Sequence, residues 1–353
     1  MTNTLRVLVV GLGNMGLSHA RAYTAIDGFA LAGLCSRGIA GRADIAQEFP
    51  GVPRFNDFDE ALAALKPDAV SINTWPDTHE AYAKAAFAAG AHVFLEKPIA
   101  ETVAGAQAVI AAARAANRKL VIGYILRVHP SWQRFIEIGR TLGKPMVMRM
   151  NLNQQSAGAN WQVHKHLMDT ISPIVDCGVH YVDVMCQVTG ARPARVHAIG
   201  ARLSDELKPG MYNYGHLHVT FDDGSVGWYE AGWGPMMSEV AFFVKDMVGP
   251  KGSVSIVAEA RASADIDSHS KTGALRLHHA ELKADGTFAR SDELITTQDE
   301  PGHQELCERE QRLFLRAIRE DLDLSAHLAD AVSSLRIVLA ADESVRTGEV
   351  VKL

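Results

Sequence analysis

The sequence predicts an α/β N-terminal domain followed by an α+β C-terminal domain with a large open, mostly antiparallel sheet. Apolar segments alternate with helix-like segments over residues 5–124, as expected for a parallel sheet covered by helices. From about Ile125 this alternation stops, and one helix is followed by several strand-like segments. The chain of 353 residues is long enough for two domains. We therefore expect a first domain over residues 1–125 and a second over residues 126–353, whose final helices can pack back on the first.

The first strand, residues 5–10, runs directly into GLGNMG at residues 11–16. The first glycine permits a tight turn, the second lets the backbone approach a pyrophosphate, and the third lets the following helix pack on the strand. Unpaired N–H groups at the start of that helix favour negative charge. The pattern is typical of a dinucleotide-binding Rossmann domain. The expected phosphate contacts are Gly11, Gly13, Asn14, Met15 and Gly16.

The end of the second strand bears on the choice of cofactor. The remaining strands are expected at residues 30–35, 67–73, 92–95 and 120–124, with helices at 16–26, 41–49, 78–89 and 102–117. Where NAD enzymes usually carry an acidic residue for the ribose, this chain has Cys35, Ser36 and Arg37. Arginine pairs with phosphate in a bidentate fork, so Ser36 and Arg37 favour NADP over NAD. The alternative is that Arg37 is a solvated loop residue and NAD binds.

The second domain begins with a short helix and a strand, at residues 131–141 and 146–152, and continues through a polar loop at 153–160. Ser172 and Pro173 are typical of a helix start and predict a helix over residues 173–188. Strands are expected at residues 194–203, 214–221, 225–233 and 239–248, and closing helices at 303–318 and 325–347. The link Asp222-Asp223-Gly224 indicates a hairpin. Residues 260–299 give no clear prediction.

Composition excludes several classes of partner. The net charge is −6 with 22% charged residues, which indicates neither a nucleic-acid-binding nor an anionic-membrane-binding protein. The four cysteines show no C-x-x-C spacing, and no apolar run approaches the length of a membrane span. No signal pattern precedes the first strand. We expect a cytoplasmic protein with a small, diffusible ligand.

Glu96, Lys97 and Pro98 follow the strand at residues 92–95. A residue before proline is biased towards extended backbone, and ligands of open parallel sheets sit beyond the carboxyl ends of the strands. The ammonium of Lys97 could there bind a substrate hydroxyl, stabilise a developing alkoxide or relay a proton. The triplet alone leaves open that Lys97 is an ordinary surface lysine.

Asp176 and His180 lie four residues apart in the expected helix at 173–188, so they share one face. A carboxylate beside an imidazole can orient it and raise its basicity, and histidine titrates near neutral pH. Oxidation of an alcohol by hydride removal needs such a base for the hydroxyl proton. Asp183 lies on nearly the same side. The alternative is that the three polar residues are the solvated stripe of an apolar helix.

Three motifs taken together identify a family. GLGNMG at 11–16, EKP at 96–98 and the spacing of Asp176, Gly178, His180 and Asp183 resemble the family of glucose-fructose oxidoreductase, inositol dehydrogenase and the rhizopine-catabolism oxidoreductases, Gfo/Idh/MocA. The resemblance covers nearly the whole chain, and the order of the motifs is more specific than any one of them.

The resemblance implies catalytic roles for Lys97, which would position and polarise the reacting hydroxyl, for His180 as general acid and base, and for Asp176, which would hold the substrate or the histidine. It also implies substrate contacts from Tyr124 and Arg127, although this segment lacks the Asn and Arg-Arg pair that relatives often carry. The positions that it matches to the cofactor are Asn73, Thr74, Trp75, His79, Glu96 and Lys97.

The segment before the expected helix at 173–188 supplies further substrate candidates. Trp161 could stack on a sugar or cyclitol, and His164 could bind hydroxyls or a carboxylate. The alternation of His164 and His166 could suggest a metal, but two histidines in a loop more often make ordinary contacts, so no metal is expected.

Aromatic side chains recur in the strands of the second domain. Tyr212, Tyr214, His216 and His218 alternate, and Trp228 and Trp233 follow in the next strand. An exposed aromatic sheet face predicts a homo-oligomer, dimer or tetramer, assembled through the C-terminal sheet.

These features predict an NAD(P)-dependent oxidoreductase that interconverts a secondary alcohol and a ketone on a cyclic polyol, a sugar or a sugar derivative. One alternative keeps the fold but uses transient oxidation to eliminate a glycoside, or acts as a dihydrodiol-type dehydrogenase. Another is a regulatory module that senses NAD(P) without turnover. Retention of Lys97, Asp176 and His180 argues against the regulatory module.

Overall fold

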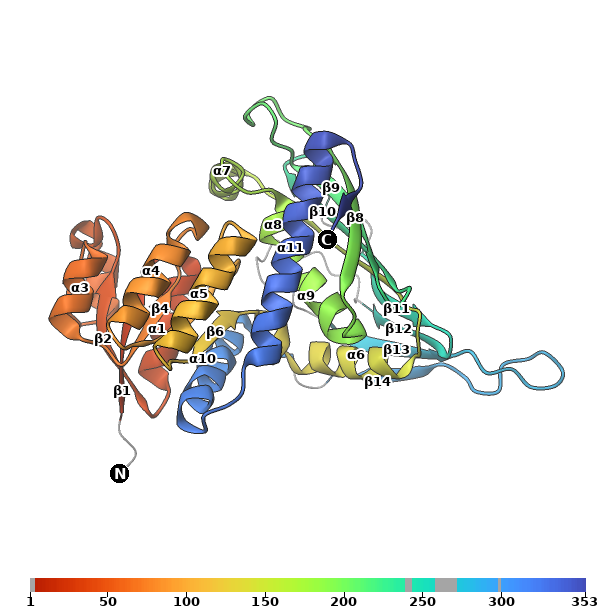
Figure 1. Cartoon of the computed structure of the whole chain (residues 1–353), viewed down its shortest axis with the longest axis horizontal. Helices are drawn as coiled ribbons and strands as arrows, with labels where there is room; N and C mark the ends of the chain where they lie inside the picture. The colour runs from red at the N-terminus through yellow and green to blue at the C-terminus, as the bar shows by residue number, and fades with distance from the viewer. Residues whose placement is uncertain (1–3, 239–242, 258–271, 298–299) are drawn as a thin grey trace. The chain divides into compact units, whose positions relative to one another are not determined.

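The computed structural model describes residues 4–238, 243–257, 272–297 and 300–353. Its contacts divide the chain into two compact units (Figure 1). The first contains Met1–Ile125 and Gly302–Val332, and the second contains Leu126–Pro301 and Ser333–Leu353. The expected second domain, residues 126–353, thus includes a segment, 302–332, whose contacts are made in the first unit.

The first unit is built on a parallel sheet of six strands in the order β3-β2-β1-β4-β5-β6. This order reverses direction between β1 and β4, which is the topological switch point of dinucleotide-binding folds. The strands are β1 (Leu5–Val10), β2 (Phe29–Cys35), β3 (Arg54–Phe55), β4 (Ala69–Ile72), β5 (His92–Glu96) and β6 (Leu120–Gly123). The sheet confirms the predicted fold class of the N-terminal domain.

Helices follow the strands of this sheet, because each parallel connection needs a crossover. They are α1 (Asn14–Ala25), α2 (Ala43–Glu48), α3 (Phe58–Leu65), α4 (Pro76–Ala88) and α5 (Val103–Ala115). Neither β3 nor α3 was predicted from the sequence. The start of α3 had a readable signal, since the carboxylate of Asp57 accepts from the N–H of Glu60 as an N-cap.

Two long helices close the chain, α10 (His303–Arg319) and α11 (Ser325–Thr347). Helix α10 returns to the first unit and packs against α1, and the core there joins Phe314 of α10 to Phe29 and Phe94 of the sheet. The beginning of α11 belongs to the same unit, and its remainder belongs to the second. No helix among the described residues is long and apolar enough to cross a membrane.

The second unit contains a nine-stranded sheet in the order β14-β13-β12-β11-β7-β10-β9-β8-β15. All neighbours are antiparallel except β7 and β10, which confirms the expected mostly antiparallel sheet. The strands are β7 (Val147–Gln155), β8 (Pro193–Ala201), β9 (Tyr214–Phe221), β10 (Val226–Gly234), β11 (Lys245–Gly249), β12 (Gly252–Val257), β13 (Ala274–His279), β14 (Glu293–Thr296) and β15 (Val351–Lys352).

Some predictions for this unit are confirmed and others need correction. The hairpin at Asp222–Gly224 joins β9 to β10, and Gly224 has a positive φ. The segment 260–299, for which no element was predicted, contains β13 and β14. The strand expected at 239–248 is β11, which begins at Lys245; residues 239–242 lie outside the described part of the chain.

One face of this sheet is packed by α6 (Pro130–Thr141), α8 (Pro173–Asp176) and α9 (Gly178–Thr189). Side chains alternate accordingly: Leu217 and Val219 of β9 are buried, whereas His216 and His218 face outward. Trp228 and Trp233 cannot share the outer face, since they are an odd number of residues apart. Trp228 is half-buried, and Trp233 is only 1% exposed, so the expectation that both belong to one aromatic face is wrong.

Candidate active site

The glycine-rich turn between β1 and α1 has the geometry that a pyrophosphate requires. Gly11 has φ +82°, and a Cβ at Gly16 would lie 1.7 Å from the carbonyl oxygen of Gly11, so both positions exclude a side chain. A Cβ at Gly13 would meet no protein atom within 4 Å. Gly13 is exposed and is the N-cap of α1, where it makes no side-chain cap. Its lack of a side chain leaves space at the helix N-terminus, as backbone binding of phosphate demands.

Ser36 and Arg37 follow directly after β2, which ends at Cys35. Ser36 is half-buried and Arg37 is exposed. Among the described residues, Arg37 makes no hydrogen bond or ion pair. Its guanidinium is therefore available to an anionic group near the end of this strand.

The loop after β4 carries three of the expected cofactor residues. The amide of Asn73 donates to the carbonyls of Val10 and Ser71, which holds the ends of β1 and β4 together at the switch point. Thr74 shares a hydrogen bond with Thr78. Trp75 is 42% exposed, so a large apolar surface faces outward beside the turn.

His79 differs from these residues, because it is fully buried. Its Nδ1 lies 2.7 Å from the carbonyl of Pro98, and its Nε2 lies 3.0 Å from the carbonyl of Thr74. Burial lowers its pKa, although the two carbonyl contacts oppose this effect. With both ring nitrogens occupied, His79 ties the β4 loop to the segment after β5 and offers no exposed atom to a cofactor.

The end of β5 places Glu96 and Lys97 in different surroundings. The carboxylate of Glu96 is buried; its Oε1 lies 3.0 Å from Nε2 of His19, and its Oε2 accepts from the N–H of Lys97. The side chain of Lys97 is half-buried, and the Lys97–Pro98 peptide bond is cis. Glu96 therefore faces the protein interior, and the sequence pattern had not shown that His19 is its partner.

Asp176 and His180 lie on two consecutive helices rather than one. Helix α8 ends at Asp176, and α9 begins at Gly178, where a Cβ would lie 2.8 Å from the ring of Tyr229. The hydroxyl of Ser172 caps α8 as predicted. The expected helix over 173–188 is thus interrupted at Cys177, although the backbone of Cys177 itself remains in the right-handed helical region (φ −91°, ψ −38°). His180 lies in the first turn of α9 and is 8% exposed.

His164 belongs to the same part of the second unit as Asp176. Its ring stacks on Trp233 at 4.4 Å, and its Nδ1 lies 2.9 Å from the hydroxyl of Ser156. Burial lowers the pKa of His164, and the charge of Asp176 opposes this effect. Cys177 lies between Asp176 and Gln154, with its sulfur within hydrogen-bond reach of both side chains. These polar groups form a candidate substrate surface.

Trp161 is not presented for stacking on a sugar. It lies on α7 (Gly158–Leu167), a helix where a polar loop was expected, and it is 5% exposed. Its ring packs in a small core with Met168, Leu207 and Trp233, and its Nε1 donates to the carboxylate of Glu206. Its role is to hold α7, and with it His164, in place.

Arg127 is expected to contact substrate, but the structure gives its guanidinium another partner. It makes a bidentate ion pair with Asp183, at 2.8 and 2.6 Å, and both side chains are largely buried. Gln187 also donates to this carboxylate. Tyr124 is buried as well, with its ring edge-on to His327. Arg127 and Asp183 therefore tie the segment after β6 to α9.

The fold and these groups define a class: a two-domain protein with a dinucleotide-binding sheet and a second domain that carries an Asp and His pair. Residues 5–124 match the family model described as "Oxidoreductase family, NAD-binding Rossmann fold", and residues 133–254 match the GFO/IDH/MocA C-terminal domain. The chain belongs to the Gfo/Idh/MocA family, as the motifs predicted.

Relatives in this family are dehydrogenases of sugars and cyclitols. The chain is 34% identical over 196 residues to UDP-N-acetylglucosamine 3-dehydrogenase of Acidithiobacillus ferrooxidans, covering 56% of this chain and 58% of that protein. It is 30% identical over 188 residues to inositol 2-dehydrogenase of Klebsiella pneumoniae, covering 52% and 53%. The matched part thus spans little more than half the length of these curated relatives.

Similarity of fold extends over the whole chain. The structure of apo scyllo-inositol dehydrogenase from Lactobacillus casei superposes with a TM-score of 0.78 at 23% identity, covering all of this chain and 99% of the other. At that identity the comparison supports the fold rather than the substrate.

Proposed function

We propose that the protein is an NAD(P)-dependent dehydrogenase that interconverts a secondary alcohol and a ketone on a cyclic polyol, a sugar or a sugar derivative. The observation that carries this proposal is the open position at Gly13, where the N-terminus of α1 has space for a phosphate. Gly13 follows β1, and Lys97 follows β5 of the same sheet. The family and its named relatives support the choice of substrate class.

The roles of the residues follow from their chemistry. The nicotinamide, when bound, would accept or return a hydride. Lys97 would donate a hydrogen bond to the reacting oxygen and stabilise its negative charge. His180 would take the hydroxyl proton during oxidation and return it during reduction. Asp176 would bind a substrate hydroxyl or orient the histidine, and His164 with Gln154 would bind further hydroxyls.

A panel of polyols and sugars tests the proposal. The purified protein, mixed with NAD⁺ or NADP⁺ and each compound in turn, should produce reduced nicotinamide with at least one cyclitol or sugar. Inositols and UDP-N-acetylglucosamine are the first choices, because the relatives are named for them. Tight cofactor binding without turnover across the panel would instead favour a nucleotide-sensing module.

We further propose that the protein accepts NADP, because Arg37 is exposed beside Ser36 at the end of β2. Replacement of Arg37 by Ala should raise KM for NADP⁺ by about tenfold, since a charge-assisted contact to the 2′-phosphate is lost. KM for NAD⁺ should change less than about twofold. Steady-state kinetics with both cofactors measures this.

Arg42→Ala is the matched control for this experiment, since Arg42 is also an arginine of the β2–α2 connection but is paired with Asp44. It should leave both KM values unchanged. A clear preference of the wild-type protein for NAD⁺, unaffected by Arg37→Ala, would overturn the proposal for NADP.

We also propose that the outer face of the second sheet binds a second copy of the chain. Val147, Val226 and Val248 are cross-strand neighbours on that face, and each is between 37% and 41% exposed. Adjacent exposed valines of this kind are typical of a surface that is covered on assembly. Light scattering should give a mass of at least two chains; the mass of one chain would refute this.

A further inference from the structure

Glu96 is the end point of a buried hydrogen-bond chain in the first unit. Its Oε1 lies 3.0 Å from Nε2 of His19, which is on α1, and its Oε2 lies 3.2 Å from the backbone nitrogen of Lys97. His19 is fully buried, and Glu96 is 6% exposed. Each oxygen of the carboxylate thus has a donor, which is what an ionised carboxylate needs in the protein interior.

The other side of His19 is also occupied. Nδ1 of His19 lies 2.9 Å from the amide nitrogen of Gln311 on α10, and the amide oxygen of Gln311 accepts from the hydroxyl of Tyr23 at 2.5 Å. Because the amide nitrogen can only donate, Nδ1 must accept, and the imidazole carries its proton on Nε2. The proton on Nε2 then points to Glu96, so every donor in the chain has an acceptor.

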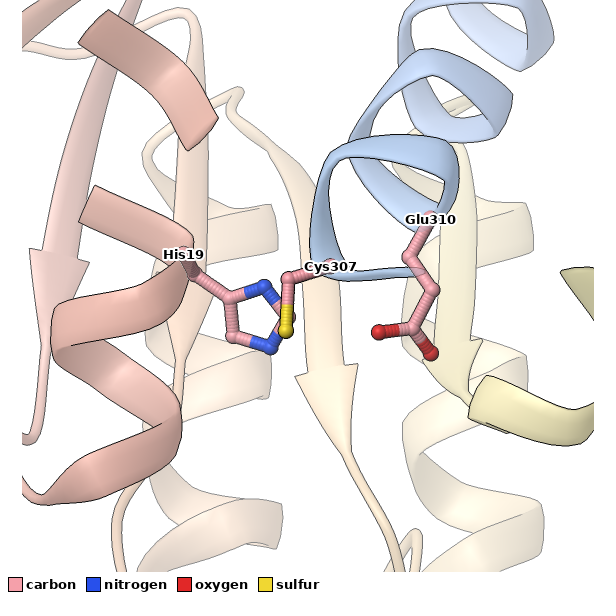
Figure 2. A group of neighbouring side chains, drawn as sticks. All are labelled: His19, Cys307 and Glu310. Atoms are coloured by element: carbon pink, nitrogen blue, oxygen red, sulfur yellow. The ribbon is translucent and has the colours of Figure 1, made fainter. Parts of the chain in front are cut away.

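Two further side chains of α10 lie beside His19 (Figure 2). The ligand atoms of His19, Cys307 and Glu310 lie within 4.8 Å of one another, a set of groups that zinc accepts elsewhere. A cation here would have to displace one hydrogen bond of His19. Both oxygens of Glu310 are buried without a hydrogen-bond partner among the described residues. Burial, with repulsion from Glu96, holds the pKa of Glu310 well above its usual range.

A protonated Glu310 predicts a specific stability profile. Its native pKa is raised above the unfolded value, so the free energy of unfolding should fall as pH rises above about 4.3, the usual pKa of glutamate. Glu310→Gln, which has no proton to lose, should match the wild-type protein at pH 4 and exceed it by at least about 2 °C in Tm at pH 8. Thermal unfolding at both pH values measures this; a Tm for Glu310→Gln at pH 8 that is no higher than that of the wild-type protein would contradict the prediction.

We propose that His19 and Gln311 are positioning residues for Lys97, acting through the carboxylate of Glu96. This rests on the proposed function, in which Lys97 binds the reacting oxygen. The hydrogen bonds lead from Gln311 on α10 through His19 on α1 to Glu96 at the end of β5. Three elements that are remote in sequence thus fix the backbone N–H of Lys97. Because that N–H belongs to Lys97 itself, these hydrogen bonds fix the backbone from which the Lys97 side chain extends.

Loss of the donor on His19 should disturb Lys97 more than the rest of the unit. The oxygen Oε1 of Glu96 would be left without its donor, and a buried carboxylate then turns towards any other donor within reach. Its second oxygen would no longer be held against the N–H of Lys97. A displacement of about 1 Å in a catalytic group can cost on the order of 10²-fold in rate.

The first experiment needs no turnover. Trace acetylation with acetic anhydride, read by peptide mass spectrometry, gives the reactivity of Lys97 relative to the exposed Lys84. His19→Leu should change this ratio by at least about threefold, and His19→Gln, which can still donate to Glu96, should lie closer to the wild-type protein. His92→Leu is the control, since His92 accepts a backbone hydrogen bond at the opposite end of β5. Unchanged reactivity of Lys97 in His19→Leu would overturn the proposal.

Gln311→Leu serves if His19→Leu does not fold. It removes the donor to Nδ1 of His19 and should shift the reactivity of Lys97 in the same direction by a smaller factor. An unchanged ratio in Gln311→Leu would equally overturn the proposal. Because acetylation is measured without substrate, a failure of the dehydrogenase proposal does not affect this result.

A double-mutant cycle then separates positioning from general structure. With NAD⁺ and myo-inositol, or whichever compound of the panel is turned over, His19→Leu should lower kcat by about 10- to 100-fold and leave the dissociation constant for NADH within about twofold. In a Lys97→Met background the same substitution should change kcat less than about threefold, because its effect passes through Lys97. Equal losses in both backgrounds would contradict a positioning role.

Discussion

Replacement of His180 by Ala should lower kcat by about 10²- to 10⁴-fold and leave cofactor affinity unchanged. The loss is large because His180 is the group proposed to take the hydroxyl proton in the transition state, and a positioned general base contributes a factor of this size. Cofactor affinity should persist, because the phosphate contacts are assigned to the turn before α1. Steady-state kinetics and fluorescence titration with NADH measure the two quantities.

His278→Ala is the control for this prediction. His278 lies on β13 and pairs with Asp292, so its loss should leave kcat unchanged. Residual activity of His180→Ala within about threefold of the wild-type protein would contradict the assignment of His180 as the acid and base. A loss of NADH binding in the same variant would show that the substitution damages the fold.

Replacement of Asp183 by Ala should lower the free energy of unfolding of the second unit by about 3–5 kcal/mol. The ion pair with Arg127 is bidentate and largely buried, and removal of one partner leaves a buried guanidinium uncompensated. Denaturant unfolding followed by tryptophan fluorescence measures the change, because four of the five tryptophans, Trp132, Trp161, Trp228 and Trp233, lie in that unit.

Glu137→Ala is the matched control, since Glu137 pairs with Arg134 on the surface of α6, and an exposed pair is worth no more than about 1 kcal/mol. The prediction also decides the role of Arg127. If the ion pair is structural, Arg127→Met should lower stability and leave KM for the substrate unchanged. If Arg127→Met instead raises KM for the substrate strongly and leaves the stability unchanged, Arg127 is a substrate contact.

Local patterns were sufficient to predict the first domain. Strands of a parallel sheet are buried on both faces and therefore read as apolar runs, as in residues 5–10 and 92–95. Glycines in a fixed pattern then identify the turn that needs them. Gly11 has the positive φ expected of a tight turn, and Gly16 excludes a side chain because the carbonyl oxygen of Gly11 lies against it. Strand β3, the shortest of this sheet, and α3 after it were missed.

Tertiary contacts set the features that were predicted wrongly. The break between α8 and α9 comes where Gly178 packs against the ring of Tyr229, a contact between residues about fifty positions apart. The faces of Trp228 and Trp233, in contrast, could have been predicted from the sequence. Side chains alternate along a strand, so residues five positions apart lie on opposite faces. The polar residues and Gly158 at the start of α7 favour a loop, and the contact that holds the helix, between Trp161 and Trp233, comes from a distant strand.

In the candidate site, too, features set by local sequence could be predicted and contacts between distant segments could not. Lys97, Asp176 and His180 could be proposed from short motifs, because each motif is local in sequence. The partners of Glu96 and Arg127 could not, since His19, Gln311 and Asp183 come from distant segments. A buried carboxylate needs donors, so the sequence could state that Glu96 had partners but not which residues they were.

Transfer of deuterium tests the central claim most directly. Myo-inositol, or another compound of the panel that is turned over, deuterated at its carbinol carbons, is incubated with the protein and NAD⁺ or NADP⁺. The account predicts reduced cofactor that carries one deuterium, seen by mass spectrometry, and a ketone product. Cofactor that binds but never acquires deuterium, or a product formed by elimination with no net reduced cofactor, would contradict it.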